Sequence, residues 1–80
     1  MEKRVTVVSI IVKESTAVEE VNKLLHLYRD YVVGRQGIPY KERGVSIISV
    51  VLDAPGDVTS ALSGKLGMIN GVAAKTLTAN

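Results

Sequence analysis

Residues 5–12 read VTVVSIIV, and this stretch decides the fold. Its side chains are mostly β-branched, a composition that is typical of a strand rather than a helix. Residues 45–52 read VSIISVVL and have the same character. A displacement of forty positions superposes the first stretch on the second and Ser9 on Ser49. This weak internal repeat predicts two similar halves, each built around one such strand.

A helix pattern follows each strand. Thr16 and Glu19 have the spacing of a capping box at the start of the first helix. The apolar residues that follow recur at helical spacing and form one stripe: Val18, Val21, Leu24, Leu25 and Tyr28. In the second half, Pro55 suits the first helical turn and Gly67 suits the C-cap. The buried stripe expected between them is Val58, Ala61, Leu62 and Leu66.

Two further strands complete the pattern, one that begins at residues 31–33 and one at residues 72–77, after the Asn70-Gly71 turn. The order β-α-β-β-α-β predicts an α+β, ferredoxin-like fold, in which two helices cover one face of a four-stranded antiparallel sheet. With right-handed crossovers, we expect the first and third strands to form the central, parallel pair. Three polar residues are expected on the edge strands: Arg35, Gln36 and Lys75.

The amino-acid composition limits the classes of protein to which this chain can belong. Eighty residues predict one small domain, residues 1–80, and the chain has no cysteine for disulfides or thiolate metal sites. The net charge is only +2, and positive and negative side chains alternate, which is typical of solvated surface rather than a nucleic-acid stripe. No apolar run approaches the ~18 residues of a transmembrane helix. A signal-peptide cleavage site is also missing, so we expect a cytoplasmic protein without a membrane partner.

Both faces of the predicted sheet are apolar, although helices cover only one of them. An uncovered antiparallel face is normally polar at alternate positions. We therefore predict a homo-oligomer, a dimer or tetramer, that packs this face or the sheet edges together. The alternative is a monomer. The residues expected on the interface are Val5, Val7, Ser9, Ile11, Val45, Ile47, Ser49 and Val51.

Few residues in the chain suggest a metal site or a catalytic site. His26 is the single histidine, and a metal ion would need three or four converging ligands, which only symmetric copies of the chain could supply. The carboxylates are not paired in an apolar pocket, and no histidine is placed to activate a serine. We therefore predict no catalytic residue, no metal ligand and no cofactor. The protein is not expected to be an enzyme.

Residues 34–44 read GRQGIPYKERG and predict a β-hairpin loop of about seven residues, since glycine and proline favour turns. Three alternatives remain for this loop: a subunit contact, a small-ligand or anion contact, and a nucleic-acid contact. A phosphate loop is disfavoured because such loops lead into a helix, whereas this one leads into a strand. The candidate residues are Gly34, Arg35, Gly37, Tyr40, Arg43 and Gly44, with Lys65 as a further candidate at the same site.

Residues 31–53 (YVVGRQGIPYKERGVSIISVVLD) and 61–75 (ALSGKLGMINGVAAK) closely resemble the family described as regulators of the iron-only hydrogenase system. The resemblance implies an ACT-like, ferredoxin-like fold and a regulatory, non-catalytic oligomer. The fold is also similar to the C-terminal domain of nickel-responsive repressors. Their nickel site does not carry over, because this chain has one histidine and no cysteine. The amino-acid site of ACT domains often needs a glycine that residues 13–16 lack.

The resulting hypothesis is a stand-alone ACT-like regulatory domain that responds to a small-molecule effector or a protein partner. Two alternatives stay open. The first is a transcriptional regulator that contacts DNA through a composite surface of the oligomer. The second is an assembly subunit of a larger redox enzyme.

Overall fold

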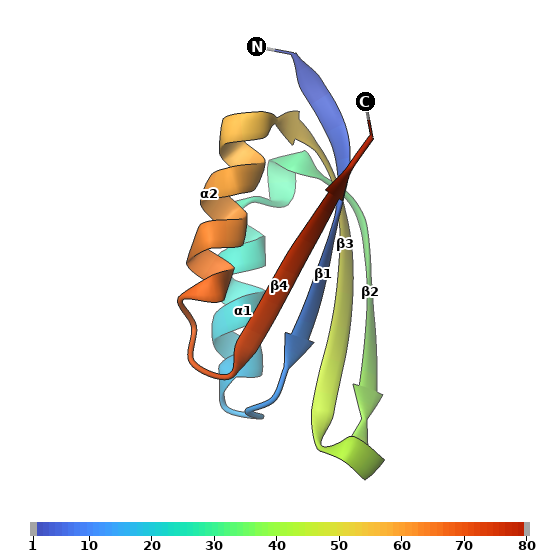
Figure 1. Cartoon of the computed structure of the whole chain (residues 1–80), viewed down its shortest axis with the longest axis vertical. Coiled ribbons are helices and arrows are strands. Elements are labelled where there is room, and N and C mark those ends of the chain that lie inside the picture. The colour runs from blue at the N-terminus through green and yellow to red at the C-terminus, as the bar shows by residue number, and fades with distance from the viewer. Residues whose placement is uncertain (1, 80) are drawn as a thin grey trace.

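The computed structural model describes residues 2–79. Four strands alternate with two helices and two short 3-10 turns along the chain (Figure 1). The elements are β1 (Lys3–Val12), α1 (Ala17–Leu27), η1 (Arg29–Tyr31), β2 (Val32–Tyr40), η2 (Lys41–Arg43), β3 (Val45–Pro55), α2 (Gly56–Gly67) and β4 (Val72–Thr78). None of the helices in residues 2–79 has the length and apolar character that crossing a membrane requires.

The four strands form one antiparallel sheet in the order β2-β3-β1-β4. Both helices lie on the same face of this sheet, and the opposite face carries no helix (Figure 1). This arrangement is the ferredoxin-like βαββαβ fold, and it confirms the predicted fold class. It also confirms that β2 and β4, which carry Arg35, Gln36 and Lys75, are the edge strands.

The predicted direction of the central pair was wrong. β1 and β3 are the central strands, but they run antiparallel, with Ser9 opposite Ser49. The helical crossover through α1 makes β1 parallel to β2, a strand with which it does not pair. The hairpin between β2 and β3 then reverses the chain, so β3 must run opposite to β1.

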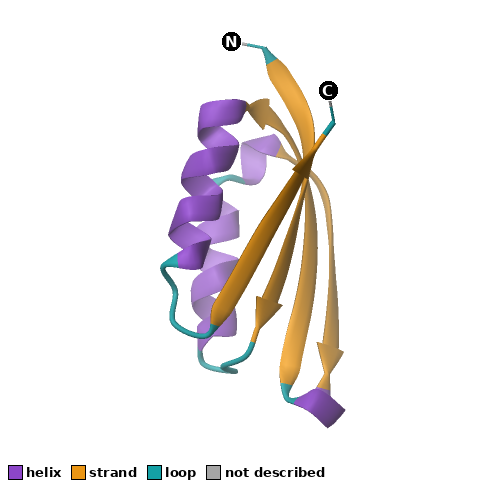
Figure 2. Cartoon of the chain, viewed as in Figure 1, coloured by secondary structure: helices purple, strands orange, loops and turns teal. Residues whose placement is uncertain are grey.

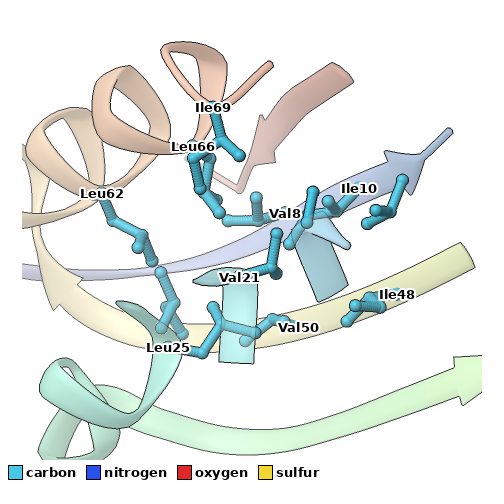
Figure 3. Packing of buried hydrophobic residues seen from close by; sticks show 12 residues of the cluster. Val8, Ile10, Val21, Leu25, Ile48, Val50, Leu62, Leu66 and Ile69 are labelled. Atoms are coloured by element: carbon cyan, nitrogen blue, oxygen red, sulfur yellow. The ribbon is translucent and has the colours of Figure 1, made fainter. Parts of the chain in front are cut away.

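The core lies between the helices and the sheet. Residues at even positions of the central strands are almost fully buried, among them Val8, Ile10, Val50 and Leu52. The helices contribute Val21 and Leu25 from α1, and Leu62 and Leu66 from α2, toward the same layer (Figure 3). Fully burying one such aliphatic side chain is worth about 1.5–3 kcal/mol, so this layer supplies most of the stabilisation of the fold.

Helix details differ from the predictions at the helix ends and along α2, where Pro55 is the N-cap rather than part of the first turn and Met68 rather than Gly67 is the C-cap. Thr16 is the N-cap of α1 as expected, but its side chain makes no capping hydrogen bond within the described part of the chain. In α2 the buried residues are Thr59, Leu62 and Leu66, whereas Ala61 is exposed. The buried stripe therefore follows an i, i+3, i+7 spacing that begins at a threonine rather than at Val58.

The glycine-rich stretch is mostly strand. β2 continues to Tyr40 and pairs with β3, so only η2 and Gly44 form the loop (Figure 2). Gly44 adopts a left-handed conformation with φ 65°, which favours glycine and closes the turn. The hairpin prediction was right, but the predicted loop was too long. Pairing with the apolar strand β3 outweighs the weak strand propensity of glycine and proline here.

Candidate functional site

The sheet face opposite the helices exposes several large apolar side chains, and we call it the open face. The structure places the residues predicted for the interface at the odd positions of β1 and β3, which project from this face. Val5 is 50% exposed, Ile11 43% and Ile47 37%, while Val7 and Val51 are partly covered by their neighbours. A contiguous patch of exposed aliphatic side chains is a feature of interaction surfaces.

Strand register arranges the open face into rows that cross the sheet from β2 to β4. One row consists of Ile38, Ile47, Ile11 and Ala73. The next consists of Gln36, Ser49, Ser9 and Lys75. The third consists of Gly34, Val51, Val7 and Leu77. Two apolar rows therefore flank one polar row, and Lys75 is the single charged side chain in these three rows.

The candidate residues of the glycine-rich stretch do not form one site. Arg35 faces the helix side, where its Nη2 donates a hydrogen bond to Asn22 Oδ1 at 2.6 Å. Tyr40 shares the open face with Ile38, because both lie at even positions of β2, two residues apart. Arg43 lies in the turn that Gly44 ends. The structure therefore separates Arg35 from Tyr40 by the thickness of the sheet.

Arg35 lines two shallow cavities between α1 and the edge strand β2. One has a volume of about 240 Å³ and is also lined by Asn22 and Pro39. The other, of about 310 Å³, is also lined by His26 and Arg29. The hydrogen bond between Arg35 and Asn22 holds the guanidinium group beside both. This is the part of the stretch that suits the predicted small-ligand contact.

Lys65, the further candidate, does not join these residues. Its Nζ donates a hydrogen bond to the Tyr28 hydroxyl at 3.1 Å and lies 5.4 Å from the centre of that ring. This contact joins the end of α2 to the end of α1 within the helix layer. Lys65 therefore has a structural partner on the face opposite Tyr40.

Comparison with known families bears directly on this architecture. The family model of TM1266-like proteins, described as "Iron-only hydrogenase system regulator, putative", matches residues 4–76. The chain belongs to the TM1266-like family. The match spans the sheet, both helices and the open face, and it confirms the family to which the sequence was assigned by resemblance.

Solved structures support the same assignment. The uncharacterized protein TM1266 from Thermotoga maritima is 40% identical, with a TM-score of 0.94, and the match covers 99% of this chain and 100% of that one. A formyltetrahydrofolate deformylase from Pseudomonas putida KT2440 is 16% identical, with a TM-score of 0.66 over 91% of this chain and 28% of that one. The second likeness shows the fold alone. No curated protein matches the chain.

Metal-binding groups are dispersed in this TM1266-like chain. Within residues 2–79, no three histidine, aspartate or glutamate side chains are close enough to hold one ion. His26 is exposed on α1, and its carbonyl oxygen accepts a hydrogen bond from Arg29 Nη1 at 3.0 Å. Convergence of symmetric copies of His26 on a metal stays an untested alternative to the prediction that the chain has no metal ligand.

Proposed function

We propose that this TM1266-like chain is a single ACT-like regulatory domain, residues 1–80, of the iron-only hydrogenase system. It acts in the cytoplasm as a homo-oligomer that assembles through the open face. Its activity responds to a small-molecule effector or a protein partner, and it performs no catalysis itself. The family description supports the regulatory role.

The open face is the observation that carries this proposal. At ~25 cal/mol per Å², covering about 300 Å² of apolar surface gains roughly 7 kcal/mol before the cost of association is subtracted. The polar row centred on Ser9 and Ser49 gives the surface a fixed pattern of hydrogen-bonding groups between two apolar rows. Such a pattern favours a defined interface over unspecific aggregation.

A lysine on the open face tests the assembly. Ile47→Lys and Val7→Lys each place a charge among the apolar rows, where an interface would have to desolvate it. We expect both variants to be monomeric in sedimentation or light scattering at concentrations at which the parent is oligomeric. Ala61→Lys is the matched control, because it adds the same charge to an exposed position of α2. It should keep the mass of the parent.

Two results would count against the proposal. If Ile47→Lys keeps the mass and stability of the parent, the open face is not the interface. If the parent is itself a monomer, the assembly hypothesis fails altogether.

The regulatory role is tested separately, by hydrogenase transcript levels in a deletion strain carrying either the parent or the Ile47→Lys chain. Equal transcript levels with and without the parent chain would contradict it.

The DNA-binding and assembly-subunit hypotheses stay predictions. Lys75 is the single charged side chain in the three central rows of the open face, and Lys3 lies at the end of the same face, opposite Pro55. Neither hypothesis gains a specific supporting observation from this arrangement.

A further inference from the structure

A second surface feature lies at the opposite side of the molecule from the open face. A cavity of about 330 Å³ lies between the first turns of α2 and the sheet. Six of its lining residues carry hydroxyl groups: Thr6, Thr59, Ser60, Ser63, Thr76 and Thr78. Arg4 and Gly56 complete the lining. We call it the hydroxyl cavity. Figure 1 shows why these segments meet: α2 begins at the end of the sheet where β1 begins and β4 ends.

The hydroxyl cavity interrupts a helix–sheet layer that is otherwise aliphatic. Among the described residues, the buried polar side chains are Thr6, 2% exposed, and Thr59, 7% exposed, and both line this cavity. The Thr6 hydroxyl is hydrogen-bonded to the Thr78 hydroxyl, with an oxygen–oxygen distance of 2.9 Å. The Thr59 hydroxyl has no hydrogen-bond partner within residues 2–79. A buried hydroxyl without a partner destabilises the fold, and a hydrogen-bonding ligand would relieve this cost.

The polar groups around the hydroxyl cavity can donate hydrogen bonds, and the hydroxyls can also accept them. Arg4 contributes a guanidinium group, and the hydroxyls can each donate one hydrogen bond. The first amide groups of α2 have no partners inside the helix, and no described side chain caps them, because the N-cap is Pro55. Asp57 lies in the first turn of α2, but neither it nor any other described carboxylate lines the cavity. A helix N-terminus with these neighbours favours a negatively charged ligand.

We propose that the hydroxyl cavity binds the phosphoryl group of a small molecule. Arg4 would pair with the phosphoryl oxygens, and the serine and threonine hydroxyls would complete their hydrogen bonds. The cavity volume corresponds to about ten water molecules at ~30 Å³ each, so it has room for a phosphate monoester as well as for inorganic phosphate. This proposal identifies the effector of the proposed regulatory function as a phosphorylated small molecule or phosphate. Only the regulatory role of the site rests on that function, since phosphate binding itself can be measured on the chain alone.

A titration followed by amide NMR tests this site. The probes are inorganic phosphate and glycerol phosphate, with sodium chloride at matched ionic strength and glycerol as controls. We expect saturable shifts of the amide signals in the first turn of α2 with phosphate but not with chloride. Arg4→Gln should weaken binding at least fivefold. Lys41→Gln is the matched control, because it removes an exposed positive charge from η2, at the opposite end of the sheet from the start of α2, and should leave the affinity unchanged (Figure 1).

Thr59→Val provides a second variant that retains side-chain volume. It removes the unpartnered hydroxyl and should also weaken phosphate binding while leaving the protein folded.

Tighter binding of glycerol phosphate than of phosphate supports a phosphorylated metabolite, and equal binding supports the free oxyanion. Shifts no larger with phosphate than with chloride would overturn the proposal. So would an equal loss of affinity in Arg4→Gln and Lys41→Gln. Neither result depends on the oligomeric state, whose own test is the mass of the parent.

Discussion

At the scale of single residues, Gly71 links the turn before β4 to the segment that follows β1. It adopts a φ of 81° just before β4, and its carbonyl oxygen accepts a hydrogen bond from the Lys13 amide at 2.7 Å. A Cβ atom at this position would meet the Glu14 side chain. The position therefore needs glycine both for its backbone conformation and for the close approach of the segment after β1.

Replacing Gly71 by alanine should lower the free energy of unfolding by about 1–2 kcal/mol, because alanine is strained at positive φ. Gly64→Ala is the matched control. Gly64 lies inside α2 with open space around its Cα, so alanine there should raise stability by about 0.5–1 kcal/mol. Urea unfolding of both variants measures the difference. A Gly71→Ala variant as stable as the parent would show that the turn adapts without strain.

At the scale of elements, α1 shows how one helix divides its side chains between core and water. Leu25 is 2% exposed and packs against the sheet, whereas Leu27, two residues later, is 72% exposed. Two residues correspond to about 200° of rotation around the helix, which takes the second leucine to the opposite side. Leucine therefore stabilises the core at position 25 and lies in water at position 27, less than one helical turn away.

Leu25→Ala should destabilise the protein by about 2–4 kcal/mol, because it removes a buried side chain and leaves a cavity. Leu27→Ala should change stability by less than about 0.5 kcal/mol in the monomer. Thermal unfolding of the two variants provides the comparison. A large effect of Leu27→Ala would mean that a second copy of the chain covers the outer side of α1.

The two helices also show why buried residues can be predicted from sequence more accurately in α1 than in α2. The stripe of α1 was predictable because Val21 and Leu25 recur at helical spacing, with the polar Asn22 and Lys23 between them. In α2, small and polar residues blur the pattern, and the stripe was assigned to Ala61 instead of Thr59. The spacing of Thr59, Leu62 and Leu66 was the available signal, but a threonine is not expected at the start of a buried stripe.

At the scale of the whole molecule, the candidate sites differ in how far sequence predicts them. The open face follows from strict alternation along β1 and β3, so its residues could be identified without a structure. The hydroxyl cavity could not, because it brings together residues such as Thr6, Thr59 and Thr78 from three separate elements. The separation of Arg35 from Tyr40 likewise depends on how far β2 extends, which glycine and proline obscured.

Assembly through the open face makes thermal stability depend on protein concentration, since dissociation accompanies unfolding. For a dimer of this size, we expect the unfolding midpoint to rise by about 3–5 °C for each tenfold increase in concentration. The Ile47→Lys variant should show a midpoint independent of concentration. Differential scanning calorimetry over a hundredfold range measures both. A concentration-independent midpoint for the parent would contradict a dimer that dissociates on unfolding.

The strand order has a consequence for the time course of folding. Only the β2–β3 hairpin joins strands that are neighbours in sequence, whereas β1 pairs with β3 and with β4, as in the pair formed by Val7 and Leu77. Contacts that close long loops form slowly. During synthesis, β1 is made before β3 and β4, and of these two partners β4 is made later. One of the two central, strongly apolar strands must therefore wait, unpaired on one side, until β4 has been made.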